Sequence, residues 1–252
     1  MHILLTNDDG IFAPGLRALE QELNRLGQVT VVAPATEQSG VGHSITYLTP
    51  LICREVRENG RQRGWAIEGS PADCVKLGIF EYCPQRPQLV VSGINGGLNA
   101  GINIMYSGTV AAAIEGAFFG ITSVAVSLEK DEHVDFDQAA TIAGRLIERI
   151  LRYSTQEPEL YNINIPTAAT RQNAEVRVVP MGLSRYGENF IRRKDPIGRT
   201  YFWATTDPPP AKTEHETDLT ALDAGYVTLT PLDYNLTSFQ QMSKMKEWDL
   251  TS

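Results

Sequence analysis

Short apolar runs alternate with amphipathic segments over the first half of the chain. Four runs are bounded by turn residues and predict buried strands at residues 2–6, 28–33, 88–92 and 121–128. Apolar positions at helical spacing predict helices at residues 14–27, 70–79, 108–119 and 135–153. Strands and helices that alternate in this way predict an α/β fold with a doubly wound, mostly parallel sheet and right-handed connections.

The pattern changes beyond Pro158. We expect a returning strand near residues 226–229 and a terminal helix at residues 238–248. Residues 182–215 have no helical period and contain a triple proline at 208–210, which predicts an extended hairpin or arm that leaves the core. We therefore divide the chain into an α/β core at residues 1–180, where we expect the functional site, and a C-terminal part at residues 181–252. The remaining predictions are mixed, strand-rich sequence at 47–68, strands at 160–165, 175–179 and 200–205, and a short helix at 218–224.

Composition narrows the functional classes. Hydrophobic residues make up 42% and charged residues 21%, which is ordinary for a globular protein and excludes disordered and fibrous classes. The formal net charge of −8 argues against binding of long nucleic acids but is compatible with a small anionic substrate. Cys53, Cys74 and Cys83 lack metal-ligand spacing, and we expect reduced structural thiols. We find no signal peptide and no membrane-spanning run, so we expect a cytoplasmic protein.

Glycine is distributed unevenly. Of the 21 glycines, 16 lie in residues 1–127. Eight of these fall in three polar loops or directly after them, and each loop follows a predicted strand, where an open parallel sheet binds its ligands.

The first loop is Asn7-Asp8-Asp9-Gly10. Adjacent carboxylates repel each other, and burying them is unfavourable unless a positive charge lies between them. A hard divalent cation such as Mg²⁺ or Mn²⁺ would resolve this conflict through oxygen ligands. The alternative is an Asx-type turn in which Gly10 supplies a positive φ.

The second loop, residues 37–44, includes Ser39, Gly40 and His43. It offers hydroxyl groups, backbone N–H groups and one imidazole, although a mobile surface loop would look the same. We place His43 in a supporting position rather than in the role of general base.

The third loop runs from Gly93 to Ser107 and leads into the helix predicted at 108–119. The side-chain oxygen of Asn95 could complete an oxygen shell with Asp8 and Asp9. A helix start with a glycine and flanking hydroxyls can bind an anion, but Ser107 or Thr109 could equally be an N-cap. Asn99 and Asn103 could likewise serve left-handed turns.

Together, a cation site and an anion-binding helix start suit the hydrolysis of a phosphate ester. The Gly-x-x-x-x-Gly-Lys-Ser/Thr, Gly-x-Gly-x-x-Gly, Gly-x-Ser-x-Gly and His-Glu-x-x-His motifs are all absent, which argues against P-loop, dinucleotide-binding, α/β-hydrolase and zincin sites.

These loops resemble the SurE family of stationary-phase survival proteins. The matching stretches are residues 3–19, 31–46, 69–79 and 91–121, with a looser match in the second half at 226–237. The resemblance implies a Rossmann-like core and C-terminal elements exchanged between subunits in a homodimer or homotetramer. It also implies a metal-dependent phosphatase that acts on nucleoside 5′-monophosphates and in addition on 3′-nucleotides and short polyphosphate.

Carried over residue by residue, the resemblance implies one divalent metal ion, Mg²⁺ or Mn²⁺, and a phosphate site. Asp8, Asp9 and Asn95 form the catalytic set. The implied metal ligands are Asp8, Asp9, Ser39 and Asn95, the implied phosphate ligands are Ser107, Gly108 and Thr109, and the supporting residues are Asn7, Gly40, His43 and Asn99.

Three functional hypotheses follow. The first is a nucleotidase in which a metal-activated water attacks the phosphate; direct attack by Asp8 or Asp9 is disfavoured because haloacid-dehalogenase-type phosphatases space their paired aspartates two apart. The second is a nucleotide or phosphate sensor without turnover, and the third is a scaffold whose arm mediates assembly.

Overall fold

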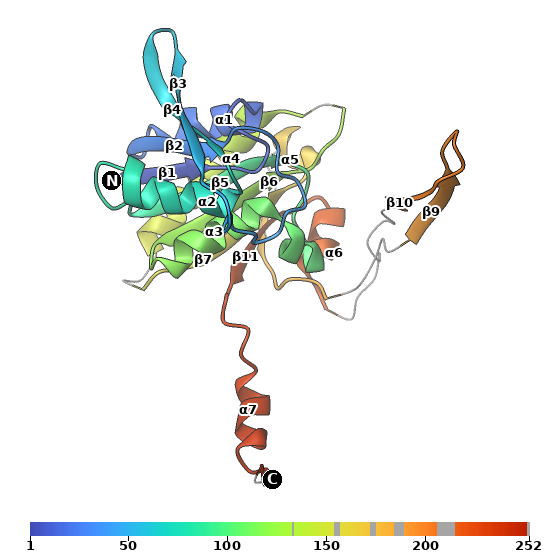
Figure 1. Ribbon diagram of the computed structural model, residues 1–252. Coiled ribbons are helices and arrows are strands. Elements are labelled where there is room, and N and C mark those ends of the chain that lie inside the picture. The colour runs from blue at the N-terminus through green and yellow to red at the C-terminus, as the bar shows by residue number, and fades with distance from the viewer. Residues whose placement is uncertain (133, 154–156, 172–174, 184–188, 206–214, 251–252) are drawn as a thin grey trace.

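The computed structural model describes residues 1–132, 134–153, 157–171, 175–183, 189–205 and 215–250. Within these residues, nine strands form one mixed sheet and two more form a separate hairpin (Figure 1). The predicted α/β fold with a doubly wound, mostly parallel sheet is therefore confirmed. No helix of the described residues is long and apolar enough to cross a membrane.

Six adjacent strands run parallel and form the centre of the sheet. β1 lies between β2 and β5, because the chain first moves to one side of β1 and later returns to its other side. Such a reversal leaves a crevice at the carboxyl ends of the two central strands. In spatial order the six strands are β4 (Arg61–Glu68), β2 (Gln28–Pro34), β1 (His2–Thr6), β5 (Leu89–Gly96), β6 (Thr122–Leu128) and β7 (Leu160–Ile165).

Three strands extend the sheet at its edges. The mixed region at 47–68 is an antiparallel hairpin of β3 and β4, and the returning strand β11 pairs antiparallel with β7 and parallel with β8. β11 therefore lies in the main sheet, although it belongs to the predicted C-terminal part; the division of the chain at residue 180 stays a prediction. These strands are β3 (Ile52–Glu58), β8 (Val176–Val178) and β11 (Val227–Leu232).

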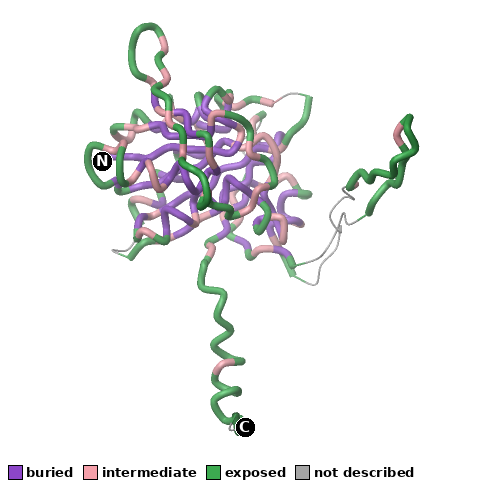
Figure 2. Tube along the Cα trace, in the orientation of Figure 1, coloured by how far each residue is buried: buried purple, intermediate pink, exposed green. Residues whose placement is uncertain are grey.

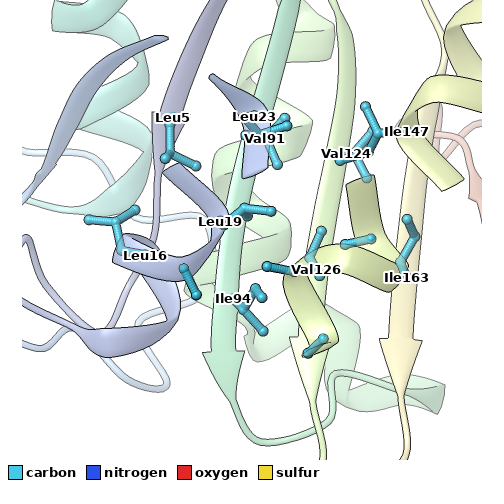
Figure 3. Close-up of a cluster of buried hydrophobic side chains, with 14 of the residues drawn as sticks. Leu5, Leu16, Leu19, Leu23, Val91, Ile94, Val124, Val126, Ile147 and Ile163 are labelled. Carbon is cyan, nitrogen blue, oxygen red and sulfur yellow. The ribbon is translucent and has the colours of Figure 1, made fainter. Parts of the chain in front are cut away.

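Helices cover both faces of the sheet, which is why its strands read as continuous apolar runs. On one face, Leu19 of α1 and Ile147 of α4 pack with Leu5 and Val91 in the largest buried cluster (Figure 3). On the other face, α2 and α3 pack with Leu4 and other strand residues. The helices are α1 (Pro14–Leu23), α2 (Pro71–Leu77), η1 (Gly78–Tyr82), η2 (Gly101–Tyr106), α3 (Gly108–Phe118), α4 (Phe136–Tyr153), α5 (Thr167–Arg171), α6 (Asp218–Asp223) and α7 (Phe239–Met245).

The third polar loop starts later than predicted. The expected start at Gly93 is wrong, because β5 continues to Gly96 after an irregularity in its pairing with β6. Beyond this irregularity Asn95 pairs with Ser127 and Gly96 with Leu128. Asn95 is thus held by the sheet itself, at the end of a strand.

The predicted arm contains an antiparallel hairpin of β9 (Asn189–Lys194) and β10 (Thr200–Thr205). The hairpin lies apart from the sheet, as does α7, and nearly all of their residues are exposed (Figure 2). The rest of the arm at 184–188 and 206–214, with its triple proline, lies outside the described residues. The three cysteines form no disulfide, and Cys74 is buried in the apolar cluster under α2.

Candidate active site

A cavity of about 640 Å³ opens at the carboxyl ends of β1 and β5. This is the reversal point of the sheet, where ligands of doubly wound folds bind. Its volume lies in the usual range for small-molecule sites, about 300–1,000 Å³. The predicted residues that line it are Asp8, Asp9, Ser39, Gly40, Asn95, Asn99 and Ser107.

Asp8 is the second residue after the end of β1 and is 4% exposed. Burial raises the pKa of its carboxyl group to about 6, the Thr109 hydroxyl that donates to Asp8 Oδ1 opposes this rise, and the charge of Asp9 adds to it. The start of α3 approaches Asp8 closely: a Cβ at Gly108 would lie 2.9 Å from the Asp8 Cβ. Only glycine allows this approach without displacing the carboxylate.

Asp9 is the second carboxylate of the cavity, and its Oδ2 accepts the backbone N–H of Gly96 at 3.1 Å. Burial raises the pKa of this carboxyl group, and the hydrogen bond from Gly96 opposes the rise. Two charges act in addition: Glu37 raises the pKa of Asp9 and Lys130 lowers it. The cavity therefore holds a buried and a half-buried carboxylate with a like charge close to each, and a cation would stabilise this arrangement.

Asn95 and Ser39 supply neutral oxygens to the same cavity. The Asn95 Nδ2 donates to the Gly97 carbonyl at 2.6 Å, which leaves its Oδ1 as the atom suited to a cation. The Ser39 hydroxyl donates to Glu37 Oε1 at 2.6 Å, so its oxygen can still accept.

This donor set consists of oxygens only. Two carboxylates, an amide and a hydroxyl fit a hard divalent cation such as Mg²⁺ or Mn²⁺. The described residues that line the cavity include no histidine and no cysteine, the side chains that zinc sites use most.

The two hydroxyl side chains at the start of α3, those of Ser107 and Thr109, make different contacts. Ser107 is the N-cap, and its side chain accepts the Val110 N–H at 3.1 Å. Thr109 is fully buried and its hydroxyl donates to Asp8, so that side chain does not line the cavity. The predicted contact of Thr109 with phosphate stays a prediction, and the structure gives this residue a second task in holding Asp8.

Asn99 is buried, and its hydrogen bonds connect the third loop to the second half of the sheet. Its backbone N–H donates to Asn164 Oδ1 at 2.8 Å and its Nδ2 to the Ser127 hydroxyl at 2.9 Å. Its carbonyl accepts from the side chains of Asn162 and Asn164 at 2.7 and 3.0 Å. The left-handed alternative for Asn99 and Asn103 is wrong, because neither has a positive φ.

Of the other supporting residues, Gly40 lines the cavity, whereas Asn7 and His43 do not. Gly10 has the expected positive φ of +97°, but the predicted Asx-type turn is not formed at Asn7, because its side chain donates to the Gly10 carbonyl at 3.0 Å and its Oδ1 accepts no hydrogen bond from the described residues. His43 does not line the cavity; its Nε2 lies 2.6 Å from Glu115 Oε2 and its ring stacks on Phe118. This contact anchors the second loop on α3.

Asp218 is a supporting residue that the sequence analysis missed. Its buried carboxylate accepts backbone N–H groups from Gly101, Gly182 and Leu219 at 2.7, 2.8 and 2.8 Å. It ties the third loop to α6, more than one hundred residues away in sequence. An aspartate at a predicted helix start usually signals a cap, which is why its pattern gave no sign of this contact.

Several lining residues were not assigned from sequence, and four of them add charge or aromatic surface. Glu37 and Lys130 add charge to the cavity, and Tyr106 and Phe136 add aromatic surface. Glu37 and Tyr106 lie inside the recognised loops, and Lys130 is the second residue after the strand predicted at 121–128, at the same edge of the sheet. The sequence therefore showed that these residues follow strands, but it did not show in which direction their side chains point.

Comparisons with known proteins agree with this architecture. The family model described as Survival protein SurE matches residues 3–188. The 5′-nucleotidase SurE of Rhodopirellula baltica is 59% identical over 251 residues, 99% of each chain. That of Syntrophobacter fumaroxidans is 40% identical over 250 residues, 99% of this chain and 100% of the relative. The crystal structure of the SurE protein from Aquifex aeolicus is 38% identical, with a TM-score of 0.84 and 98% of both chains covered. The resemblance seen in the loops is thereby confirmed, and this chain belongs to the SurE family.

Proposed function

We propose that this protein is a metal-dependent phosphatase that hydrolyses nucleoside 5′-monophosphates to nucleoside and phosphate. The observation that carries the proposal is the pair of adjacent carboxylates of Asp8, which is buried, and Asp9, which is half-buried, facing a cavity large enough for a nucleotide. The name 5′-nucleotidase carried by whole-length relatives supports the same activity.

Asp8, Asp9, Ser39 and Asn95 would hold one Mg²⁺ or Mn²⁺ ion. When bound, such an ion polarises a phosphoryl oxygen and makes a water molecule more acidic. The chain contributes the geometry: Thr109 and Gly96 orient the two carboxylates, and the pairing of β5 with β6 orients Asn95. Preorganised groups of this kind need no rearrangement when charge develops on the phosphate.

The rest of the cavity suits the two halves of a nucleotide. At the start of α3, the Ser107 hydroxyl lines the cavity, and the Gly108 N–H, which has no helical acceptor, can face phosphate oxygens; the Val110 N–H is already bonded to Ser107. Apolar and aromatic side chains line the same cavity and can contact the nucleoside without reading one base. This apolar part consists of Leu98, Tyr106, Val134 and Phe136.

The direct test is a substrate panel with the purified protein. Nucleoside 5′- and 3′-monophosphates and short polyphosphate are each incubated with Mg²⁺, Mn²⁺ or a chelator, and released phosphate is measured. The proposal predicts metal-dependent release, fastest from the 5′-monophosphates, with 3′-nucleotides and polyphosphate as slower substrates. Binding of nucleotide without release under every metal condition would identify a sensor instead.

Asp9→Asn tests the cation site while keeping the shape of the side chain and its bond to Gly96. We expect turnover to fall by more than about 100-fold, because one charged ligand is lost. Added Mn²⁺ should raise the Tm of the wild-type protein but not that of the variant. The metal-free variant should be at least as stable as the metal-free wild type, because a half-buried charge that repels the buried Asp8 carboxylate is removed.

The matched control for that experiment is Asp137→Asn on the exposed side of α4, which should behave as wild type. Undiminished turnover or an undiminished Mn²⁺ response in Asp9→Asn would refute the cation site.

Thr109→Val separates the two roles of Thr109. The substitution removes the hydroxyl that donates to Asp8 and keeps the shape of the buried side chain. Because hydrogen bonds to charged groups are the stronger ones, we expect Mn²⁺ affinity to fall about tenfold, and Thr109→Ser should restore it. Calorimetric Mn²⁺ titrations measure this. A normal Mn²⁺ affinity combined with weaker phosphate binding would assign the hydroxyl to phosphate alone.

We also propose that the protein forms a homodimer or homotetramer through its C-terminal part. An isolated two-stranded hairpin is at best marginally stable in water. In this hairpin, cross-strand pairing places Trp203 beside Ile191 on one face and Phe202 beside Arg192 on the other, and both aromatic side chains are more than half exposed. A second copy of the chain that covers these faces would account for both features.

The expected cytoplasmic location of the protein remains a prediction.

Replacing Phe202 and Trp203 by serine tests the assembly. We expect the wild-type protein to run as a dimer or tetramer in light scattering at micromolar concentration, and the variant to have a smaller mass, because the uncovered aromatic surface is lost. Leu48→Ser, at a residue 91% exposed in a loop, is the control. An unchanged mass in the double variant, or a monomeric wild type, would contradict the assembly.

A further inference from the structure

Lys130 lies at the rim of the cavity because of how the end of β6 is held. Gly97 of the third loop donates its N–H to the Leu128 carbonyl at 2.8 Å, which joins β6 to the end of β5. The next residue, Glu129, is turned toward α5: its carboxylate accepts the Thr167 N–H at 2.8 Å and its carbonyl accepts the Thr167 hydroxyl at 3.2 Å. Lys130 follows and lines the cavity.

The charges of the cavity lining are unbalanced. Three carboxylates line it, those of Asp8, Asp9 and Glu37, whereas Lys130 is the one cationic side chain among the described lining residues. Within the described part of the chain, no carboxylate lies at ion-pair distance from the Lys130 ammonium group. The ammonium group of Lys130 is exposed at the rim of the cavity, and within the described residues no ion pair restrains it.

A phosphate ester dianion must enter this negative cavity. A divalent cation at Asp8 and Asp9 and one lysine together balance the three carboxylates; without the lysine, the site stays net negative before the substrate arrives. Lysine suits phosphate because its ammonium group is a compact charge with three donors on a flexible stem. The nucleoside can contact the apolar lining at Leu98, Tyr106, Val134 and Phe136, so the lysine charge is not required to bind that half of the substrate.

We propose that Lys130 is a substrate-binding residue whose ammonium group donates hydrogen bonds to the phosphate oxygens of the nucleotide. The proposal rests on the proposed nucleotidase function and names the group that recognises the charged half of its substrate. Lys130 carries no proton to or from the reacting atoms in this role; it holds the phosphate beside the cation site.

The test compares Lys130→Met, which keeps the stem and removes the charge, with Lys130→Arg, which keeps the charge. Arg149→Met, on the exposed side of α4, removes a charge outside the cavity and is the control. Calorimetry measures the binding of Mn²⁺ and then of inorganic phosphate to the Mn²⁺-loaded proteins. Steady-state kinetics measure KM for adenosine 5′-monophosphate and the inhibition constant of adenosine.

For Lys130→Met we expect the phosphate Kd and the KM to rise by about 10- to 100-fold, as for the loss of a charge-assisted hydrogen bond. Mn²⁺ binding should stay equal or become tighter, because a positive charge near Asp9 is gone, and the adenosine inhibition constant should not change. Lys130→Arg should stay within about threefold of wild type, and Arg149→Met should match wild type.

Three results would overturn the proposal. Phosphate affinity could stay at the wild-type value in Lys130→Met, Mn²⁺ affinity could fall in parallel with phosphate affinity, or adenosine binding could weaken as much as phosphate binding. A wild-type protein that binds phosphate but releases none from nucleotides would refute the nucleotidase function alone, since the phosphate titration still decides the role of Lys130.

Discussion

The burial of the Asp8 carboxylate at the end of β1 is the constraint on which the rest of the site depends. A buried carboxylate beside a second one is unfavourable, and the raised pKa of both groups expresses that conflict. Hydrogen bonds from the Thr109 hydroxyl at the start of α3 and from the Gly96 N–H lower the free-energy cost of these charges, but they do not remove it. The remaining conflict favours a cation, and it can be maintained because the packed core on both sides of the sheet holds β1 in place.

That arrangement depends on the order of the strands. β1 lies beside β5, so Asn95 at the end of β5 stands next to the carboxylate pair, and α3 can direct its first turn at Asp8 only across a glycine. The third loop is held from the other half of the molecule by Asn164 and Asp218. Residues 218–232 therefore belong to the structural support of the site as well as to the C-terminal part of the chain.

The sequence predicted most of this architecture because strand and helix periods are local properties. The carboxylate pair, the three loops and the start of α3 could be located from residue types and their position after strands. The end of β5 was mispredicted because Gly-Ile-Asn-Gly has the composition of a loop, and only pairing with β6 extends the strand. Contacts across long sequence distances, such as Asp218 with Gly101, leave no local pattern. The direction of a side chain is equally invisible, which is why Thr109 and Lys130 acquired their roles only in three dimensions.

The account depends most directly on the cation site between Asp8 and Asp9. A crystal structure of the protein soaked in Mn²⁺, with anomalous diffraction used to locate the metal, tests it. The account predicts one strong anomalous peak in the cavity, within bonding distance of oxygens of Asp8, Asp9 and Asn95, at about 2.0–2.3 Å. Absence of a peak at these residues in crystals of a protein whose phosphatase activity requires Mn²⁺, or a peak bound by other side chains, would contradict it.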